Sequence, residues 1–596
     1  MSPDIILVFV ILAVAVVLFV SERLRVDLVA MLVLITLSLT GLVTTEEAFS
    51  GFASPAVITV WSVYIVSGAL FRSGVADSLA RFMLRIAGEN YVRILVVIMV
   101  TVGVMSSFMN NIGAVAILLP AVVSVARRIN VAPSKLLIPM AFTSLLGGKM
   151  TLIGTPPNIL ATSIMETYGG LEPFQFFDFA PMGAIVLLTG ILYFVFIGRH
   201  LLPERTPGGD LSQVYQIREY LSEVRIKDSS PLHATTLAET RLGEAYDLTV
   251  LQIRRVDQAP LNARPDLKLR AGDVLLVEGP SDNLLRASEA LSLEALAEWK
   301  FEDFNEKSGT SHEMIDITLA PRSSLQGKTL KQINFRAQFG LNVLAIQHGG
   351  ESRVSQIADI PLDFGDTLLV RGPKNRIDVL RRDSQFLMLE TPPIESRRLN
   401  KAPLAVLILL GVLIAVSTRL LHVSTAMLIG AMLMVLTNVI NMDEAFQAIE
   451  WKSVFLIAGM LPMGIAMQTS GTALFLAEGI IDLVGGWGPL AVLMGIFLMT
   501  ALTTEVMSNA AATVLVTPIA IDAARSLGAN PQTFVMAVVI AAATSFLMPI
   551  GHQANVLVFG PGGYRFFDYT KVGVWLNVII FIIVTITLPM IWPMFR

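Results

Sequence analysis

The sequence predicts a polytopic α-helical membrane protein built from two inverted repeats, with two small α/β modules inserted between them. Three observations predict this fold: long apolar segments, a register in which the two halves of the chain match, and a polar segment between those halves. Of the 596 residues, 54% are hydrophobic and only 15% are charged. Soluble domains carry about 25% charged residues, so most of this chain is expected to lie in a membrane.

Composition and motifs exclude several classes of function. The net charge is −4 and the basic residues fall in short loops, so no nucleic-acid partner is expected. The chain has no cysteine, which excludes disulfides, thiol catalysis and cysteine metal sites. No P-loop, HExxH or GxSxG pattern occurs, so we expect no enzyme, and no cofactor beyond Na⁺ as a coupling ion. The N-terminal segment lacks a basic start and a cleavage site, which indicates a retained span.

The first membrane repeat, residues 1–203, contains apolar segments long enough to cross a hydrocarbon layer of about 30 Å. They lie at residues 4–20, 26–43, 55–72, 92–128, 134–167 and 181–198. Residues 92–128 are expected to form a re-entrant hairpin, which leaves five crossings. Basic residues flank one set of segment ends: Arg23, Arg25, Arg72, Arg81, Arg85, Arg93, Arg127, Arg128, Lys135 and Arg199. Because cytoplasmic loops are enriched in Lys and Arg, this side is predicted to be cytoplasmic.

The second repeat, residues 399–596, matches the first when the sequence is shifted by 397 positions. Glu47 then meets Glu444 and Gly154 meets Gly551, and both glutamates are expected to cap helices. An odd number of crossings in the first repeat inverts the second, as in secondary transporters with inverted repeats. The second repeat fits the positive-inside rule less well, because Arg419 and Arg525 fall on the predicted outer side.

The inserted segment, residues 204–398, is charged and carries alternating apolar residues typical of strands. A shift of 93 aligns its two halves, and "LLVEGP" meets "LLVRGP". Two α/β modules are therefore predicted, at residues 222–290 and 312–385. Both ends of the insert are basic, which places it in the cytoplasm. The modules either bind a small cytoplasmic regulator such as a nucleotide or serve as a rigid scaffold. No GxGxxG follows a strand, which argues against NAD.

Two polar segments interrupt apolar stretches at matching positions: Asn110-Asn111-Ile112-Gly113 and Ser508-Asn509-Ala510. A backbone turn at membrane depth is tolerated only where protein, water or ligand satisfies its freed N–H and C=O groups. We expect each segment to be a hairpin tip, with helices at 92–109 and 114–127 in the first repeat. Helix ends at the midplane offer N–H groups to an anion and carbonyl groups to a cation. Alternatively, Asn111 and Asn509 join helices by hydrogen bonds.

A broken helix follows each predicted tip. "GGKMTLIGTPPN" at 147–158 contains glycines and prolines that disfavour a continuous helix, and "MPIGHQAN" at 548–555 repeats its end. Tips and breaks together give the candidate substrate-binding residues Asn110, Asn111, Gly113, Thr155, Pro156, Ser508, Asn509 and Ala510. Candidates for cation binding or coupling are Ser106, Asn111, Lys149, Gly154, Thr504, Glu505, Asn509, Gly551 and His552.

Three of these candidates are ionisable residues at predicted membrane depth, where charged groups are costly and usually functional. Lys149 either occupies a cation position, pairs with the anion, or reaches the cytoplasmic interface by snorkelling. Glu505 is either a proton-coupling carboxylate or a partner for a neighbouring helix dipole. His552 either titrates near neutral pH or is a structural histidine.

With these tips and breaks, the sequence resembles the divalent anion/sodium symporter family of the ion-transporter superfamily over both membrane halves. Members of that family carry a Ser-Asn-Thr signature at each tip. Here Ile112 and Ala510 stand in place of the threonine. "IGTPPN" is close to the family's first helix break, whereas "IGHQAN" departs from the second. The insert resembles two TrkA-type C-terminal (RCK-C) modules, and "GPGGYRFFDYTKVG" at 560–573 is similar to the ending of a subgroup associated with sulfate uptake.

The resemblance implies a secondary active transporter of the cell inner membrane that imports a divalent inorganic anion, most simply sulfate, with Na⁺ or H⁺. It also implies alternating access by elevator motion and a homodimer. The alternatives are a dicarboxylate symporter, an oxyanion extruder, or a ligand-sensing receptor that no longer transports. A K⁺ channel is a further alternative because RCK modules regulate such channels, but no TVGYG-like filter is present.

Overall fold

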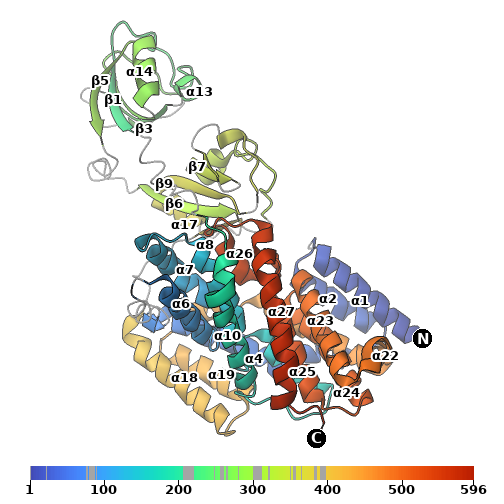
Figure 1. Ribbon diagram of the computed structural model, residues 1–596. Helices are drawn as coiled ribbons and strands as arrows, with labels where there is room; N and C mark the ends of the chain where they lie inside the picture. Colours follow the sequence, from blue (N-terminus) through green and yellow to red (C-terminus); the bar gives the residue numbers. More distant parts are fainter. Residues whose placement is uncertain are drawn as a thin grey trace. The chain divides into compact units, whose positions relative to one another are not determined.

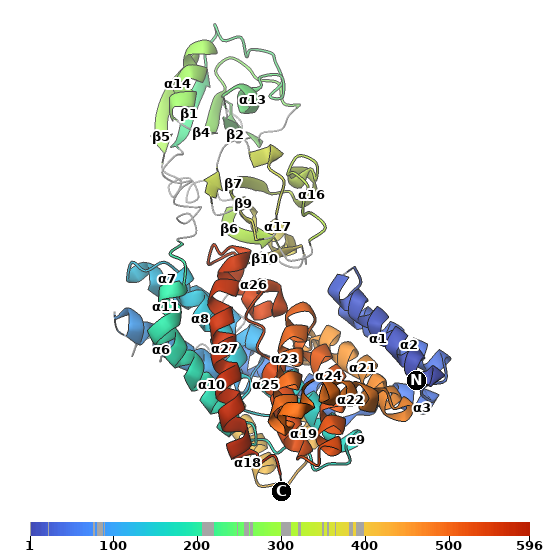
Figure 2. The ribbon, with the colours of Figure 1, turned by 45° about the vertical axis from the view of Figure 1, so that its right-hand side comes forward.

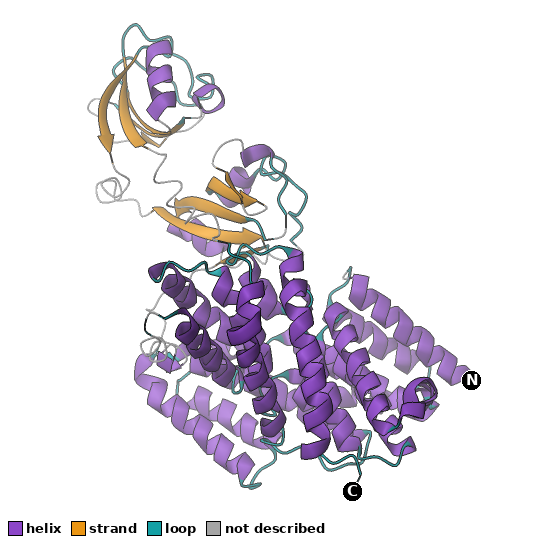
Figure 3. Cartoon of the chain, in the orientation of Figure 1, coloured by secondary structure: helices purple, strands orange, loops and turns teal. Residues whose placement is uncertain are grey.

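The computed structural model divides the chain into two compact units, residues 1–205 with 391–596 and residues 206–390. Figure 1 draws the chain, and Figure 3 shows that the strands belong to the inserted unit. The structure describes residues 2–595 except 22, 76–77, 80–87, 89, 206–219, 247, 256–260, 263–265, 280, 300–311, 320–322, 349–350, 354–356, 364, 381–384 and 389–397. Arg81 and Arg85, used above to orient the first repeat, lie outside the described residues.

The regular secondary structure of the first repeat is helical in its described residues. Its elements are α1 (Pro3–Ser21), α2 (Val26–Leu39), α3 (Thr45–Ser50), η1 (Gly51–Ala53), α4 (Pro55–Arg72), α6 (Tyr91–Ser106), α7 (Asn111–Arg128), α8 (Ser134–Gly147), α9 (Pro156–Thr167) and α10 (Ala180–Tyr193). A π-helical turn, η2 (Phe194–Gly198), and α11 (Arg199–Leu201) extend α10.

The second repeat presents the same order of elements. They are α18 (Ala402–Ser417), α19 (Val423–Leu436), α20 (Met442–Ala448), α21 (Trp451–Ser470), α22 (Thr472–Val484), α23 (Pro489–Val506), α24 (Asn509–Ser526), α25 (Pro531–Ala542), α26 (Gln553–Phe559) and α27 (Phe566–Ile591). Short 3₁₀ turns are η5 (Leu399–Lys401), η6 (Gly485–Trp487) and η7 (Pro549–Gly551). Among the described residues, seven helical segments are long and apolar enough to cross a membrane, and further apolar helices are shorter. The polytopic membrane fold is thus confirmed.

The predicted helix caps at Glu47 and Glu444 are confirmed. Glu47 forms a capping box with Thr44 at the start of α3, and Glu444 forms the equivalent box with Asn441 at the start of α20. In each box the carboxylate accepts the free N–H of the capping residue, and the capping side chain accepts the N–H of the glutamate.

Packing between the repeats follows their internal symmetry. α2 packs on α21, and the equivalent helices α19 and α4 pack on each other in the same way. α10 packs on α27, its counterpart at the end of the second repeat, and both views place these helices side by side (Figures 1 and 2). Pro55 at the start of α4 and Val423 at the start of α19 line one cavity. Since η1 and α3 join the end of α2 to that start of α4, α2 and its equivalent α19 run in opposite directions.

The membrane helices form two groups. The first contains α1–α4 and α18–α21, the second contains α6–α11 and α23–α27, and α22 contacts both. α9 and α24 of the second group pack on α4 and α21 of the first, so these four helices form the boundary.

The insert leaves one of these helix groups and returns to the other. Before it begins, the Arg205 N–H donates to the Ser134 hydroxyl at 2.9 Å, and its guanidinium lies 3.2 Å from the Asp568 carboxylate. Both partners belong to the second group. After it ends, the Arg398 N–H donates to the Arg72 carbonyl oxygen at 2.9 Å, and its guanidinium lies 3.1 Å from Glu444. These partners belong to the first group.

The insert contains two five-stranded antiparallel sheets. The first has the order β3-β2-β4-β1-β5, formed by β1 (Tyr220–Ile226), β2 (Thr249–Arg254), β3 (Leu261–Asn262), β4 (Val274–Gly279) and β5 (Leu293–Trp299). The second has the order β10-β6-β9-β7-β8, formed by β6 (His312–Leu319), β7 (Asn342–His348), β8 (Glu351–Arg353), β9 (Thr367–Pro373) and β10 (Phe386–Met388). The helices that follow β4 and β9 are α14 (Ser281–Ala290) and α17 (Lys374–Leu380).

The two modules repeat each other strand for strand. Under the shift of 93, β2 meets β7 and β4 meets β9, and the register of each pair shifts at the equivalent residues Val250 and Val343. One difference concerns a buried carboxylate. Asp273 of the first module pairs with Arg255 at 2.8 Å, whereas the equivalent Asp366 pairs with His348 at 2.8 Å. The two modules therefore hold the same carboxylate with a permanent cation in one case and a titratable ring in the other.

Candidate functional site

The first tip lies at residues 107–110, between α6 and α7. The amide of Asn110 caps α7, since its Oδ1 accepts a hydrogen bond from the Ile112 N–H at 3.1 Å. The helix begins at Asn111, so the turn lies earlier in the chain than the predicted Asn110–Gly113 segment. Gly113 lies inside the first turn of α7, and a Cβ added there would meet only the Met109 side chain at 3.7 Å. The position therefore does not require a glycine.

Two buried oxygens at this tip lack partners among the described residues. Asn111 is 2% exposed and Ser106 is fully buried. Neither Asn111 Oδ1 nor Ser106 Oγ has a hydrogen-bond partner within the described part of the chain. A Cβ added to Gly148 would lie 2.8 Å from Asn111 Oδ1, so the tip packs directly on the first helix break. Buried polar atoms are nearly always hydrogen-bonded, and exceptions indicate strain or an absent ion or ligand.

The first break, residues 148–155 between α8 and α9, is held by side chains that satisfy its backbone. Asn158 Nδ2 donates to the carbonyl oxygens of Gly148 at 3.2 Å and Thr151 at 2.7 Å. The Thr151 hydroxyl donates to the Ser107 carbonyl and ties the break to the tip. Close backbone packing requires Gly154, since a Cβ there would lie 2.4 Å from the Gly148 oxygen. These contacts explain why this segment departs from a helix.

The two candidate residues after this break begin α9. Thr155 occupies the N-cap position, is 2% exposed and makes no side-chain capping bond. Pro156 is the first helical residue, where its missing N–H costs nothing. The structure thus gives Pro156 a helix-starting role and leaves the buried Thr155 hydroxyl near the break.

The second tip is built on Ser508 and Asn509. Ser508 caps α24, since its hydroxyl accepts from the Ala511 N–H at 3.3 Å. The Oδ1 of Asn509 accepts hydrogen bonds from the Thr504 and Ser545 hydroxyls, each at 2.8 Å. Ala510, the next residue, is 8% exposed. Unlike Asn111, Asn509 is already satisfied by neighbouring side chains.

The second break lies between α25 and α26 and repeats one key bond of the first. Asn555 Nδ2 donates to the Ser545 carbonyl at 2.9 Å, as its equivalent Asn158 does to Gly148. His552 caps α26, because its Nδ1 accepts from the Ala554 N–H at 3.0 Å. A Cβ added to Gly551 would lie 3.2 Å from Glu505 Oε2. His552 therefore has the structural role that was one of its two predicted readings.

Glycine 148 and serine 545 account for the difference between the tips. They are repeat-equivalent, and each carbonyl is held by the repeat's asparagine. The Ser545 hydroxyl donates to Asn509 Oδ1, whereas Gly148 has no side chain to do so for Asn111. Sequence reasoning missed both residues. The signal was available, because each lies six residues before the matched glycines Gly154 and Gly551.

Lys149 is buried between the two repeats. It is 1% exposed, its Nζ has no hydrogen-bond partner among the described residues, and it lies 5.9 Å from the centroid of the Phe546 ring. The snorkelling alternative does not apply, because the ammonium group does not reach a surface. A buried charge without a partner is costly unless another charge enters the site.

The Glu505 carboxylate accepts hydrogen bonds from the backbone of the second break. Its Oε1 accepts from the Phe546 and Leu547 N–H groups, both at 2.9 Å, and its Oε2 accepts from the Met548 N–H at 3.2 Å. Three N–H groups left free by the end of the helix therefore meet one carboxylate. This geometry is that of a partner for exposed backbone donors.

The site offers oxygen ligands of the hydroxyl, amide and carbonyl kinds. Among the described residues, no group of three or more His, Asp or Glu side chains is placed to hold a metal ion. Unwound carbonyls and helix ends are the groups that hold Na⁺ in broken-helix transporters. At the first tip, Ser106, Asn111 and the Gly148–Gly154 backbone provide such groups.

Comparisons with known proteins agree with this architecture. A model of the citrate transporter (CitMHS) family matches residues 16–532. An uncharacterized transporter of Synechocystis sp. is 36% identical over 95% of this chain and 94% of its own length. The uncharacterized transporter YfbS of Escherichia coli is 34% identical over the whole of both chains. Sodium/sulfate cotransporter 1 of Chlamydomonas reinhardtii is 22% identical over 90% of this chain and 84% of its own.

The family match spans both membrane repeats, and two relatives above 30% identity extend over nearly the whole chain. These relatives are transporters by name, which confirms the prediction that the chain is not an enzyme. The protein belongs to the citrate transporter family of membrane transporters.

Proposed function

We propose that this transporter is a secondary active importer of a small divalent oxyanion, sulfate before others, driven by Na⁺. The observation that carries the proposal is that two buried oxygens of the first tip, Ser106 Oγ and Asn111 Oδ1, have no partner among the described residues, and that Asn111 Oδ1 lies beside Gly148. A bound Na⁺ would give these oxygens a ligand bond. A proton would not, because neither the amide nor the hydroxyl takes one up. This favours Na⁺ over H⁺ as the coupling ion.

The cation position is proposed at the first tip, where Asn111 Oδ1 has no partner among the described residues. At the second tip the Ser545 hydroxyl donates to Asn509 Oδ1 at 2.8 Å, while the Thr504 hydroxyl lies 2.8 Å from the same oxygen and 2.6 Å from the Ala542 carbonyl oxygen. A hydroxyl has one proton to donate, and Ser545 uses it where a cation would otherwise bind. The proposal is therefore one Na⁺ site per chain at the first tip.

The anion is proposed to bind between the tips, where Lys149 supplies the positive charge. Its ammonium group has no hydrogen-bond partner in the described part of the chain and lies beside Phe546 of the other repeat. The N-termini of α7 and α24 carry the amide and hydroxyl of Asn110 and Ser508. Anions are stabilised at helix N-termini by free N–H groups and the helix dipole.

Sulfate is favoured over a carboxylate by two observations. Ile112 and Ala510 replace, at both tips, the threonine that the resembled family uses for carboxylate substrates. A relative that matches 90% of this chain is named a sodium/sulfate cotransporter. The second candidate is a citrate or dicarboxylate carrier, which is favoured by the citrate transporter family itself.

The remaining features of the proposal follow the sequence. Residues 1–203 and 399–596 form the membrane repeats, in which 92–128 and its counterpart are re-entrant hairpins. Residues 204–398 lie in the cytoplasm, where the RCK-C-like modules bind a small regulator. The protein is proposed to work in the cell inner membrane as a homodimer, with one helix group moving against the other.

Uptake of radiolabelled sulfate into proteoliposomes tests the proposal. Uptake should require an inward Na⁺ gradient and should be lost in Asn111→Ala. Unchanged uptake in that variant contradicts the site, and competition by citrate or succinate without competition by sulfate selects the carboxylate carrier. Ligand binding to the insert without flux of any tested anion would identify a receptor instead.

A further inference from the structure

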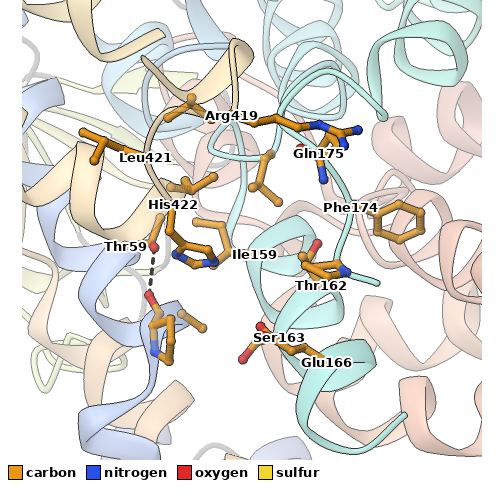
Figure 4. A pocket seen from close by; sticks show the side chains of 16 residues that line it. Thr59, Ile159, Thr162, Ser163, Glu166, Phe174, Gln175, Arg419, Leu421 and His422 are labelled. Carbon is orange, nitrogen blue, oxygen red and sulfur yellow. Dashed lines mark hydrogen bonds between the residues drawn. The ribbon is translucent and has the colours of Figure 1, made fainter. Parts of the chain in front are cut away.

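A cavity of about 300 Å³ lies at the boundary between the two helix groups. Its wall comes from the start of α4, the end of α9 with the loop that follows, and the turn between α18 and α19 (Figure 4). Leu152 of the first helix break also lines it, so the cavity adjoins the candidate site. The polar lining side chains include Thr162, Ser163, Glu166, Gln175, Arg419 and His422.

Arg419 is an exposed residue that lines this cavity, and no side chain of the described part of the chain pairs with its charge. Within the described part of the chain, its guanidinium forms no hydrogen bond or ion pair, and Figure 4 shows it beside the Gln175 amide with Glu166 at the opposite end of the cavity. The backbone of Arg419 is left-handed, with φ of 57°. This conformation closes α18 as a Schellman motif, in which the Arg419 and Leu420 N–H groups donate to the Val416 and Ala415 carbonyl oxygens.

Arg419 is also one of two arginines that violate the positive-inside pattern. The other, Arg525, donates from its guanidinium to the Gly169 carbonyl just after α9, which is a structural role. Among the described residues, Arg419 has no such contact. The fold therefore explains Arg525 as a helix cap and leaves Arg419 facing a cavity.

The cavity lies at the end of α18 opposite to the residue at which this helix begins, Ala402. The chain returns from the insert at the start of α18, and the cavity is at the other end of this 16-residue helix. A helix of that length spans roughly 24 Å. If the insert is cytoplasmic, the cavity faces the outside, from which an imported anion arrives.

We propose that this cavity is an external capture site for the transported oxyanion, with the guanidinium of Arg419 and the amide of Gln175 as its donors. This inference rests on the proposed function for the identity of the anion. A cationic group in a cleft raises the local concentration of an anion and speeds its entry. Glu166 at the far end opposes anions there and confines binding to the Arg419 end.

A cysteine placed in the cavity reports the electrostatics without requiring transport. The chain has no native cysteine, so Ser163→Cys in the full-length protein gives one reactive thiol. The measurement is the ratio of its reaction rates with an anionic and a cationic methanethiosulfonate reagent. Arg419→Gln should lower the rate with the anionic reagent roughly fivefold, the effect of one nearby unit charge in water, and raise the rate with the cationic reagent by a similar factor, so that the ratio falls. Arg419→Lys should restore it, and Glu166→Gln should raise it.

Arg23→Gln is the matched control, because it removes the same charge from the equivalent loop of the other repeat, at the opposite end of its helices. That variant should leave the ratio unchanged. The capture site is overturned if the ratio is the same with and without Arg419→Gln, or if neither reagent reaches the cysteine at position 163.

Transport measurements then distinguish failure of the capture site from failure of the proposed function. In proteoliposomes of one orientation, Arg419→Gln should raise the KM for sulfate roughly fivefold, with kcat unchanged, and only for sulfate supplied from the side opposite the insert. If the wild-type protein moves no sulfate, the proposed function fails, while the thiol rates still decide whether the cavity attracts anions. If the wild type transports and Arg419→Gln has an unchanged KM, the capture site alone fails.

Discussion

Lys149 and Phe546 occupy equivalent positions of the two membrane repeats, and the ammonium of one lies 5.9 Å from the ring centroid of the other. The internal symmetry of the chain therefore brings a cation and an aromatic ring together where a symmetric dimer would place two identical residues. The ring partly compensates the buried charge, since a cation over an aromatic face is attracted by its quadrupole.

Lys149→Met is expected to stabilise the protein and abolish uptake. Methionine fills a similar volume without a charge, and replacing a buried unpaired charge by an apolar side chain is stabilising by about 1 kcal/mol or more. Thermal unfolding in detergent measures the first effect and sulfate uptake the second. A more stable variant with normal uptake would show that the ammonium has no part in transport.

Gly148→Ser is expected to remove the Na⁺ dependence of uptake. A Cβ at this position would lie 2.8 Å from Asn111 Oδ1, so the Asn111 amide must shift to admit it, and the new hydroxyl would then donate to that oxygen as Ser545 donates to Asn509. The reciprocal change, Ser545→Gly, should remove one of the two hydroxyls that contact Asn509 Oδ1 and increase the Hill coefficient for Na⁺. Uptake measured against Na⁺ concentration checks both variants. An unaltered Na⁺ response in Gly148→Ser would rule out a cation at the first tip.

Glu505→Gln separates the structural from the proton-coupling role of this carboxylate. The amide keeps one acceptor oxygen, so at least one of the three backbone N–H groups loses its partner. A buried donor without a partner costs about 1–3 kcal/mol, so the melting temperature should fall. The pH dependence of uptake in the folded fraction should match the wild type. A flattened pH profile at normal stability would instead indicate a coupling carboxylate.

The second module of the insert should become less stable as pH rises through the pKa of Asp366. Burial raises this pKa above its ordinary value, while the hydrogen bond from His348 lowers it less strongly. A folded-state pKa above the unfolded one means that stability is fullest below the unfolded pKa, near 4, and is lost above it. Asp366→Asn should abolish this slope in proteolysis of the insert between about pH 4 and 6.

The first module, in which Arg255 stands at the position of His348, is the control for that measurement. The pKa of Arg255 is raised, mainly by the hydrogen bond with Asp273, and this side chain stays charged throughout this pH range. His348→Arg, which copies the first module into the second, should make the second module more resistant to proteolysis near neutral pH. Equal pH responses of the wild type and Asp366→Asn would contradict the burial argument.

Much of the fold could be predicted because the two membrane repeats can be aligned with each other from the sequence alone. The shift of 397 placed Glu47 with Glu444 and Gly154 with Gly551, and both pairs occupy equivalent elements. The exact position of the turn at the first tip could not be predicted. It depends on whether Asn110 or Gly113 precedes the start of α7, and the structure shows that the Asn110 amide caps this helix. The pairing of Lys149 with Phe546 depends on how the two repeats pack, which no local pattern encodes.

The attachment of the insert has a mechanical consequence. Arg205 fastens its start to Asp568 in one helix group, and Arg398 fastens its end to Glu444 in the other. Any sliding of one group past the other therefore changes the distance between Arg205 and Arg398, the two points at which the insert is held. A metabolite that fixed the modules would then slow the transport cycle without touching the anion. Cleavage of the chain within the insert would remove this inhibition.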